Sequence, residues 1–370
     1  GYHACELASD SSWGCCHSHL KVDTVVAFAT IMGRGVGKTI FVTGVNGHIG
    51  NHIVEDLLLN GYNVKGSVRD LADPNKVDHV IAHAKKLDCQ QRLELVEGDV
   101  LDSEGWEQHL AGCDGLFHTA TIYATSGDGQ LIIDTANMGT DNLLKAAAKV
   151  GINRVVYTSS VAAVGSEPKG KVKDHTDWQT NTSMPYVMAK TESERHAWKL
   201  AKQFNLDLRV INPSGVLGGG FSRPTPSTDI IGDALAGKFP MTMKIPMAFV
   251  HVKDVAMAHR RAFEVDEASG RFILAPHNNT TVAALHKRTR ELYPKSKSPK
   301  LALQNWMLPL AVFQDWVGAI FTKKRVLTRQ IAKGIMRGDA DYDSTPATEV
   351  LGIEWIDVDT TIKDTVEAYQ

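Results

Sequence analysis

The sequence predicts an α/β fold with a doubly wound parallel sheet. Strand-like and helical segments alternate along most of the chain, which is typical of right-handed βαβ units. The length of 370 residues, with 43% hydrophobic and 22% charged residues, is that of a globular chain large enough for two domains. The strand-like segments occupy residues 39–43, 63–68, 92–96, 116–119, 154–158 and 208–211, which is the pattern of a Rossmann sheet.

Charge and cysteine content restrict the possible partners. Lys and Arg (40) nearly balance Asp and Glu (42), so the net charge of −2 offers no positive field for nucleic acid. Only Cys89 and Cys113 lie beyond the first 38 residues, which indicates a reducing compartment and a cytoplasmic protein. The Cys and His residues near the N-terminus lack the paired spacing of zinc ligands, so no metal site is expected.

Two segments stand apart from this pattern. Residues 1–38 keep no helical or strand period, and we expect an extension that is disordered or not native, with Met32 as a candidate start. Residues 301–321 are apolar, but polar side chains interrupt them and Pro309 is expected to kink them, so they do not form a membrane span. We interpret this stretch as an amphipathic cover of the substrate in preference to a membrane-surface helix, and expect no membrane partner.

A glycine-rich turn follows the first strand-like segment. Gly44, Gly47 and Gly50 stand directly before a helical pattern over 52–59. Glycine allows a tight turn and lets backbone amides approach a pyrophosphate, whose charge a helix N-terminus stabilises. The spacing alone also fits a turn without a ligand, but its place at the start of the alternating pattern favours a dinucleotide site.

The end of the second strand-like segment bears on the cofactor. A site that prefers NAD places Asp or Glu there, whereas this chain has Arg69, followed by Lys76 seven positions on. An arginine offers a planar fork to a 2'-phosphate and a lysine adds a point charge. We therefore predict NADPH as the cofactor, with exposed surface cations as the alternative interpretation of these two residues.

A catalytic constellation is predicted from three residues. Tyr186 and Lys190 are four residues apart on a helical pattern, so the ammonium can lie near the phenol and lower its pKa. Ser160 follows the strand-like segment 154–158, at the edge where open α/β sheets place ligands. It can hydrogen-bond a substrate oxygen within reach of Tyr186.

From about residue 39 to the C-terminus, the chain resembles the extended short-chain dehydrogenase/reductase family, in its dihydroflavonol-reductase-like branch with microbial aldehyde and ketone reductases. Seven segments carry the likeness: 42–50, 68–70, 98–100, 117–120, 157–160, 186–190 and 249–256. The resemblance implies a catalytic triad of Ser160, Tyr186 and Lys190, and implies that Arg69 and Lys76 face the 2'-phosphate. It further implies that the cofactor is bound by Gly44, Asn46, Gly47, His48, Ile49, Gly50, Asp99, Val100, Thr119, Ala120, Tyr186, Lys190, Pro213 and Ser214.

The resemblance also implies two domains. An NADP-binding Rossmann domain is expected from 39–212 plus 249–271, and a smaller, mostly helical C-terminal substrate domain from 213–248 plus 272–370. A homodimer is usual in the family.

Departures from the family pattern concern the substrate. Thr121 is followed by Ile122 and Tyr123 where the branch has Ser or Thr and then Pro, and the signature of cinnamoyl-CoA reductases is not found. We therefore expect neither a flavonoid nor a CoA thioester. Candidate pocket residues, each of which also suits an ordinary core position, are Ile122, Tyr123, Val161, Phe221, Met241 and Met247. His118 is expected to be a hydrogen-bonded strand-end residue and not a base.

The leading hypothesis is an NADPH-dependent carbonyl reductase that converts an aldehyde or ketone of small to medium size to an alcohol. An NAD(P)-dependent sugar-nucleotide epimerase or dehydratase, or a hydroxysteroid-dehydrogenase-like enzyme, ranks lower. Epimerases tend to keep NAD, which Arg69 disfavours, and the acidic pair that dehydratases place after the serine-strand threonine does not follow Thr158. A non-catalytic NADPH-sensing module is the third reading, although such relatives lack the tyrosine and lysine present here.

Overall fold

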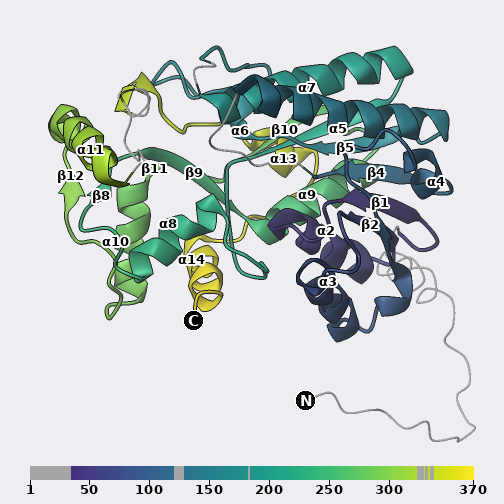
Figure 1. Cartoon of the computed structure of the whole chain (residues 1–370), viewed down its shortest axis with the longest axis horizontal. Coiled ribbons are helices and arrows are strands. Elements are labelled where there is room, and N and C mark those ends of the chain that lie inside the picture. Colours follow the sequence, from purple (N-terminus) through teal and green to yellow (C-terminus); the bar gives the residue numbers. More distant parts are fainter. Residues whose placement is uncertain (1–34, 121–128, 182–183, 323–328, 330–331, 334–336) are drawn as a thin grey trace, which may run out of the picture.

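The computed structural model describes residues 35–370, apart from 121–128, 182–183, 323–328, 330–331 and 334–336 (Figure 1). Nearly all of the predicted extension 1–38 lies outside the described residues. The candidate pocket residues Ile122 and Tyr123 also lie outside them.

A seven-stranded sheet forms the centre of the protein (Figure 1). Its strand order is β10-β6-β5-β4-β1-β2-β3, and every neighbouring pair is parallel. This order confirms the predicted doubly wound Rossmann fold. The strands are β1 (Thr39–Thr43), β2 (Asn63–Val68), β3 (Leu93–Glu97), β4 (Gly115–His118), β5 (Arg154–Thr158), β6 (Asp207–Pro213) and β10 (Gly270–Leu274).

Helices cover both faces of this sheet, so the central strands β1, β4, β5 and β6 are almost entirely buried, whereas the edge strand β3 exposes Glu94 and Glu97. Along β1, Ile40 and Val42 belong to the core under α2 and α9, whereas Phe41 belongs to the core under α5 and α7. This alternation is the two-residue period of a strand. The helices of this part are α2 (His48–Leu59), α3 (Pro74–Lys86), α4 (Trp106–Leu110), α5 (Gly129–Lys149), α6 (Val161–Val164), α7 (Pro185–Phe204) and α9 (Val252–Glu264), with the 3-10 turn η1 (Gln90–Arg92).

A second group of elements lies beyond the end of β6 (Figure 1). It holds a three-stranded sheet of β7 (Gly215–Leu217), β9 (Pro246–His251) and β11 (His277–Thr281), and a two-stranded sheet of β8 (Thr242–Met243) and β12 (Ala302–Leu303). Its helices are α8 (Pro226–Leu235), α10 (Val282–Leu292), α11 (Leu308–Thr322) and α14 (Val358–Glu367), with the 3-10 turn η2 (Asn305–Met307). The short helix α13 (Thr345–Glu349) instead packs against β10 of the central sheet.

The chain passes between these two groups more than once. After β9 it enters α9, which packs beside α2, and β10 then pairs with β6. The predicted domain boundary at 271 falls inside β10, and the division into two domains stays a prediction. Pro309 lies in the first turn of α11, where a proline is tolerated, so the predicted kink is not found. Among the described residues, no helix is long and apolar enough to cross a bilayer.

Candidate active site

The glycine turn joins β1 to α2 with little room for side chains. Gly44 has φ +67°, and a Cβ on Gly50 would lie 2.2 Å from the carbonyl oxygen of Gly44. Gly47 is the N-cap of α2 and supplies no side-chain cap to the first amides of the helix. These amides and the helix dipole therefore suit a pyrophosphate, as the sequence predicts for Asn46, His48 and Ile49.

The ends of β1 and β4 are fastened beside this turn. The buried Thr43 hydroxyl accepts hydrogen bonds from the backbone N–H groups of Thr119 (3.0 Å) and Ala120 (2.9 Å). It also lies 2.9 Å from Nδ1 of His118, whose pKa is lowered to about 4 by burial and by the charge of Lys190. The prediction that His118 is a hydrogen-bonded strand-end residue is confirmed.

The predicted adenosine-phosphate residues lie at the ends of β2 and β3. Arg69 is exposed just after β2, whereas the Lys76 ammonium lies 3.3 Å from Asp73 and 3.4 Å from Asp70. The Asp99 carboxylate accepts the Leu101 N–H at 3.1 Å. The backbone carbonyl of the neighbouring Val100 accepts the Asn142 amide at 3.0 Å. Arg69 is thus the more accessible cation for a phosphate, and Lys76 would have to leave two carboxylates.

The predicted catalytic residues come from two helices at one edge of the sheet. Ser160 is the N-cap of α6, and its hydroxyl accepts the Ala162 N–H at 3.1 Å. Tyr186 lies in the first turn of α7, and Lys190 follows one turn later with 6% of its surface exposed. Burial lowers the pKa of Lys190 to about 8, and the nearby Glu194 opposes that shift. The charge of Lys190 also contributes to the lowered pKa of His118 at the end of β4.

Glu194, one further turn along α7, is a buried residue whose contacts support the site and which the sequence did not single out. Its buried carboxylate accepts hydrogen bonds from the Ser159 hydroxyl (2.5 Å), the Asn212 amide (2.8 Å) and Arg271 Nε (2.5 Å). Asn212 also donates to the backbone carbonyl of Ser160 at 3.2 Å. The helix that carries Tyr186 and Lys190 is thus tied to the strand ends around Ser160. The sequence signal that could have pointed to Glu194 is its position four residues after Lys190 on the same helix.

Pro213 ends β6 beside this network, and Ser214 follows it. The Ser214 hydroxyl donates to the Leu274 carbonyl at 2.9 Å, which fixes it against the end of β10. Both residues therefore lie at the carboxyl edge of the sheet, where the sequence predicts the nicotinamide.

A cavity of about 650 Å³ adjoins the predicted catalytic residues. Val161 and Val187, the immediate neighbours of Ser160 and Tyr186, line it, although the three predicted catalytic side chains do not. Met241 and Met247 line it as well. Phe221 does not, because its ring packs between His48 and Tyr369, at 5.5 and 5.4 Å between centroids. Lining residues that the sequence reasoning did not find include Met184, Ile230, Phe239, Met243, Ile245 and Tyr342.

The cavity is largely apolar, but its lining includes acidic residues. Its lining residues include four carboxylic acids, which are Glu167, Asp229, Asp233 and Asp339. No Lys or Arg is among the lining residues that the structure describes. One of the four acids, Asp339, accepts from the buried Lys173 ammonium and is thereby neutralised.

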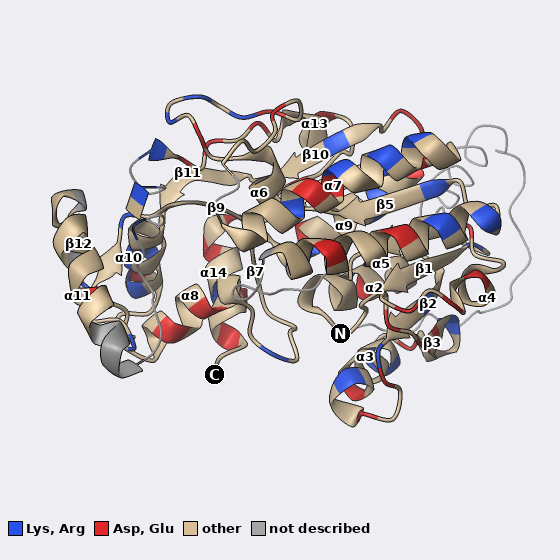
Figure 2. Cartoon of the chain, turned by 45° about the horizontal axis from the view of Figure 1, so that its top comes forward, with Lys and Arg blue, Asp and Glu red and all other residues tan. Residues whose placement is uncertain are grey.

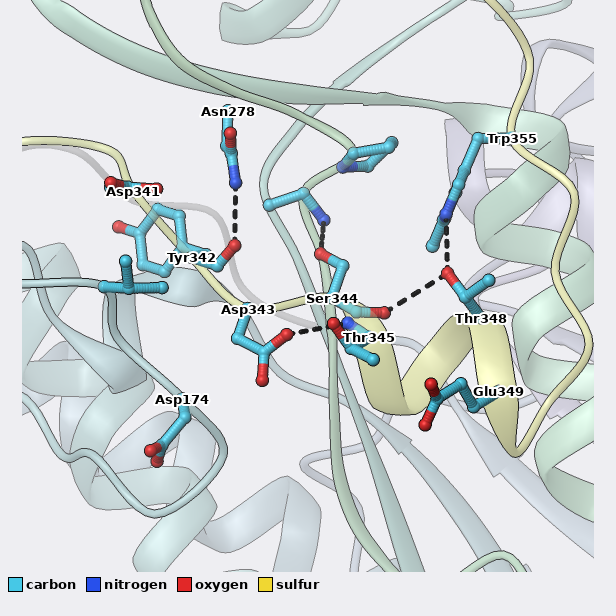
Figure 3. Close-up of a pocket in the computed structure, with 13 residues that line it drawn as sticks. Asp174, Asn278, Asp341, Tyr342, Asp343, Ser344, Thr345, Thr348, Glu349 and Trp355 are labelled. Carbon is cyan, nitrogen blue, oxygen red and sulfur yellow. Dashed lines mark hydrogen bonds between the residues drawn. The ribbon is translucent and has the colours of Figure 1, made fainter.

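A second cavity, of about 670 Å³, lies near α13 and holds none of the predicted site residues (Figure 3). Its polar groups serve the local backbone: the Ser344 hydroxyl accepts the Ala275 N–H at 2.9 Å, and Asp343 accepts the Thr345 N–H at 2.9 Å. Asn278 donates to the Tyr342 carbonyl at 2.7 Å. This cavity therefore lies where β10, β11 and α13 meet.

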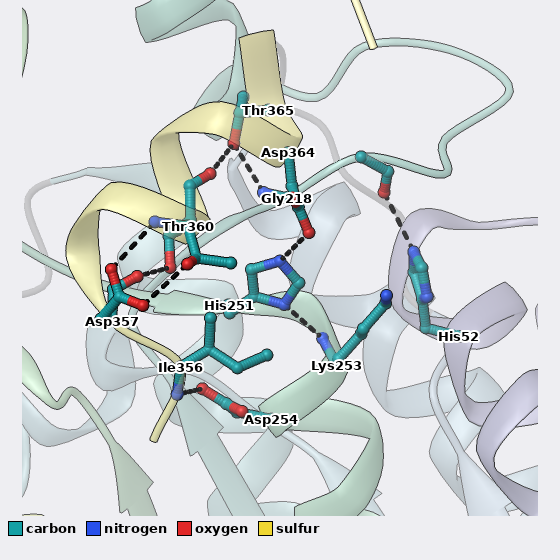
Figure 4. Close-up of polar contacts among 12 residues, drawn as sticks. His52, Gly218, His251, Lys253, Asp254, Ile356, Asp357, Thr360, Asp364 and Thr365 are labelled. Carbon is teal, nitrogen blue, oxygen red and sulfur yellow. Dashed lines mark hydrogen bonds and ion pairs between the residues drawn. The ribbon is translucent and has the colours of Figure 1, made fainter. Parts of the chain in front are cut away.

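The segment around His251, which contributes to the family resemblance, has a structural role (Figure 4). His251 caps α9 by accepting the Lys253 N–H at 3.1 Å, and its other ring nitrogen lies 3.1 Å from Asp364 on α14. Asp254 accepts the Ile356 N–H at 3.1 Å. On α2, His52 lies 3.0 Å from the carbonyl of Gly219, so the loop after β7 is held against α2 near the glycine turn.

Comparisons with known proteins identify the family. The model of the NAD dependent epimerase/dehydratase family matches residues 40–275. The chain is 37% identical over 284 residues to cinnamoyl-CoA reductase CAD2 of Medicago truncatula, covering 72% of this chain and 84% of that protein. It is 31% identical over 277 residues to the bifunctional dihydroflavonol 4-reductase/flavanone 4-reductase of Malus domestica, covering 71% and 78%.

Among solved structures, Gre2 of Candida albicans in complex with NADPH superposes with a TM-score of 0.69 and 26% identity, over 90% of this chain and 98% of that one. Its sheet architecture and the matched sequences agree with the predicted resemblance. The chain therefore belongs to the NAD dependent epimerase/dehydratase family, and it is an oxidoreductase that works with a nicotinamide dinucleotide.

Proposed function

We propose that the protein is an NADPH-dependent carbonyl reductase that converts an aldehyde or ketone of small to medium size to an alcohol. The observation that carries this proposal is the position of Tyr186 and the buried Lys190 on α7, next to a largely apolar cavity whose lining includes Val161 and Val187. A hydride acceptor in that cavity would lie beside a proton donor at the carboxyl edge of the sheet.

The residues around the glycine turn fit the cofactor. The uncapped amides at the start of α2 would hold the pyrophosphate, and the exposed Arg69 would hold the 2'-phosphate of NADPH. When bound, NADPH supplies the hydride. The matched complex of Candida albicans Gre2 also contains NADPH, which supports this choice.

The chain itself handles the proton. Tyr186 donates it to the carbonyl oxygen, which Ser160 orients. A tyrosine must lose about three pKa units from about 10 to act near neutrality, which amounts to about 4 kcal/mol. A cation at about 4 Å with an effective dielectric of about 20 supplies about that much. Lys190, with a pKa of about 8, is protonated at neutral pH and can be that cation.

The cavity favours an uncharged substrate. Its described lining combines methionine, isoleucine and aromatic side chains with carboxylates, and offers no Lys or Arg to the phosphates of a CoA thioester. This supports the prediction of a free aldehyde or ketone, although cinnamoyl-CoA reductases are among the relatives.

The test follows NADPH absorbance with a panel of free aldehydes, diketones and cyclic ketones, with cinnamoyl-CoA as the charged comparison. We expect oxidation of NADPH with one or more free carbonyls, little with NADH, and little with the CoA ester. Tight NADPH binding without oxidation by any carbonyl would contradict the proposal and indicate a sensing module. Faster turnover of the CoA ester than of every free carbonyl would contradict the substrate class.

A further inference from the structure

The outer surface of α11 exposes large apolar side chains. Among the described residues of this region, Trp306 is 80% exposed, Leu310 55%, Phe313 58% and Trp316 51%. Together with Val317 we call these residues the aromatic face. Leu310, Phe313 and Val317 recur at helical spacing, so they form one continuous stripe. Such a stripe is unusual on a surface that contacts only water.

The opposite side of α11 is already packed. Leu308 and Val312, which are 3% and 9% exposed, contact Met243 and Ile245. Met243 and Ile245 also line the cavity beside the catalytic residues. The inner side of α11 therefore packs behind two residues of the cavity lining, and the aromatic face is turned away from the protein. That this segment covers the substrate stays a prediction.

The sequence around α11 is strongly basic. Residues 293–338 contain nine Lys and Arg and a single acid, Asp315, in a chain whose net charge is −2. In the described part, Lys295, Lys297 and Lys300 are exposed just before β12. Figure 2 shows α11 largely without charged residues, at the end of the molecule opposite α4. An apolar aromatic stripe within a basic segment has the composition of helices that lie in the interface of an anionic membrane.

We propose that the aromatic face docks on an anionic phospholipid bilayer, with α11 lying in the interfacial layer. Tryptophan rings prefer this layer, and neighbouring lysines are attracted by acidic headgroups. Docking of a second copy on the same face is less favourable, because a two-fold interface would bring two basic segments together. This proposal changes the expectation of no membrane partner, since an interfacial helix need not span the bilayer.

Docking has a consequence for the substrate, and this consequence rests on the proposed function. Because α11 separates the cavity from the aromatic face, docking places the cavity next to the bilayer. Carbonyl compounds that partition into the membrane would then enter from the lipid. Docking itself is independent of turnover and can be measured without any carbonyl.

The test is co-sedimentation of the full chain with vesicles of phosphatidylcholine alone and of phosphatidylcholine mixed with phosphatidylserine. We expect binding to the mixed vesicles, weaker binding to phosphatidylcholine alone, and weakening by salt. The double variant Phe313→Ser/Trp316→Ser should lose roughly tenfold or more in affinity, and Lys300→Glu about fivefold or more. The controls Leu59→Ser and Lys86→Glu, which change exposed residues of α2 and α3, should bind as the parent does.

Three results would overturn the proposal. The first is that the parent chain binds neither kind of vesicle. The second is that the control variants lose as much vesicle affinity as the tested variants. The third is that the parent does not bind vesicles but self-associates through Phe313 and Trp316 in sedimentation velocity. The last result would assign the aromatic face to contacts between copies of the chain. NADPH binding is measured for each variant to show that the variant is folded. If the double variant misfolds, Lys300→Glu still tests the proposal.

Discussion

Arg271 on β10 donates its Nε–H to the Glu194 carboxylate on α7 at 2.5 Å, and both side chains are buried. The same guanidinium donates to the carbonyls of His175 (2.9 Å) and Asp177 (2.5 Å) and lies over the ring of Trp178 at 4.1 Å. This pair therefore connects the edge strand of the sheet to the helix that carries the predicted proton donor.

Replacement of Glu194 tests this connection. Glu194→Gln leaves the buried Arg271 without a counter-charge, so we expect the free energy of unfolding to fall by about 3–5 kcal/mol. Glu192→Gln, an exposed position on the same helix, should change stability by less than about 0.5 kcal/mol. Urea unfolding of both variants measures the difference. Equal stability of the two variants would show that Glu194 contributes no more than a surface residue.

The pKa of Lys190 predicts a pH dependence. If Tyr186 needs the Lys190 ammonium, kcat/KM for carbonyl reduction should fall as pH rises through about 8, where that ammonium loses its proton. Glu194 raises the pKa of Lys190, so Glu194→Gln should move the same fall to lower pH. Profiles of kcat/KM for both enzymes test this. A profile that is flat through this range would mean that the charge of Lys190 does not govern the reaction.

The central sheet could be predicted closely because buried parallel strands are short, continuous apolar runs. The predicted bounds of β2 and β5 agree with the structure at both ends. The helix α2 begins at His48, four residues before the predicted pattern, because its first turn contains Gly50 and Asn51 and shows no apolar period. These elements can be predicted because their patterns depend only on residues that are neighbours in the sequence.

The site was harder to predict, because it depends on distant pairs. The role of Glu194 requires Arg271, which is 77 positions away. Phe221 and Met241 have equal apolar character in the sequence, yet only Met241 lines the cavity. The cavity combines residues from Val161 to Tyr342, and no local pattern records which apolar side chain faces it.

Tyr186→Phe removes the predicted proton donor while keeping the ring. We expect kcat/KM to fall by about 10²–10⁴-fold, because general acid catalysis contributes about that much. Fluorescence titration should show little change in the Kd of NADPH. Tyr293→Phe, at the end of α10, serves as the matched control and should keep full activity. Retained activity in Tyr186→Phe would contradict the assigned donor.

Arg69→Ala tests the choice of cofactor. Loss of a charge-assisted contact of about 1.5–3 kcal/mol should weaken NADPH binding by roughly tenfold to hundredfold and leave NADH binding nearly unchanged. Lys76→Ala should have a smaller effect, because Asp70 and Asp73 already pair with this lysine. Titration of both cofactors into each variant measures the preference. An equal loss for NADPH and NADH in Arg69→Ala would remove Arg69 from the 2'-phosphate site.

Two glycines of the turn should respond differently to alanine. A Cβ on Gly50 would lie 2.2 Å from the backbone oxygen of Gly44, so Gly50→Ala should force α2 away from β1 and destabilise the protein by about 3 kcal/mol or more. A Cβ on Gly47 would lie 3.3 Å from the same oxygen, and Gly47→Ala should cost less than about 1 kcal/mol. That methyl group would instead stand where a pyrophosphate approaches the amides of α2, so the Kd of NADPH should rise about tenfold or more. Thermal unfolding measures the loss of stability in each variant, and NADPH titration measures the loss of cofactor affinity. A Gly50→Ala variant that is as stable as the parent and binds NADPH normally would contradict the assigned close contact.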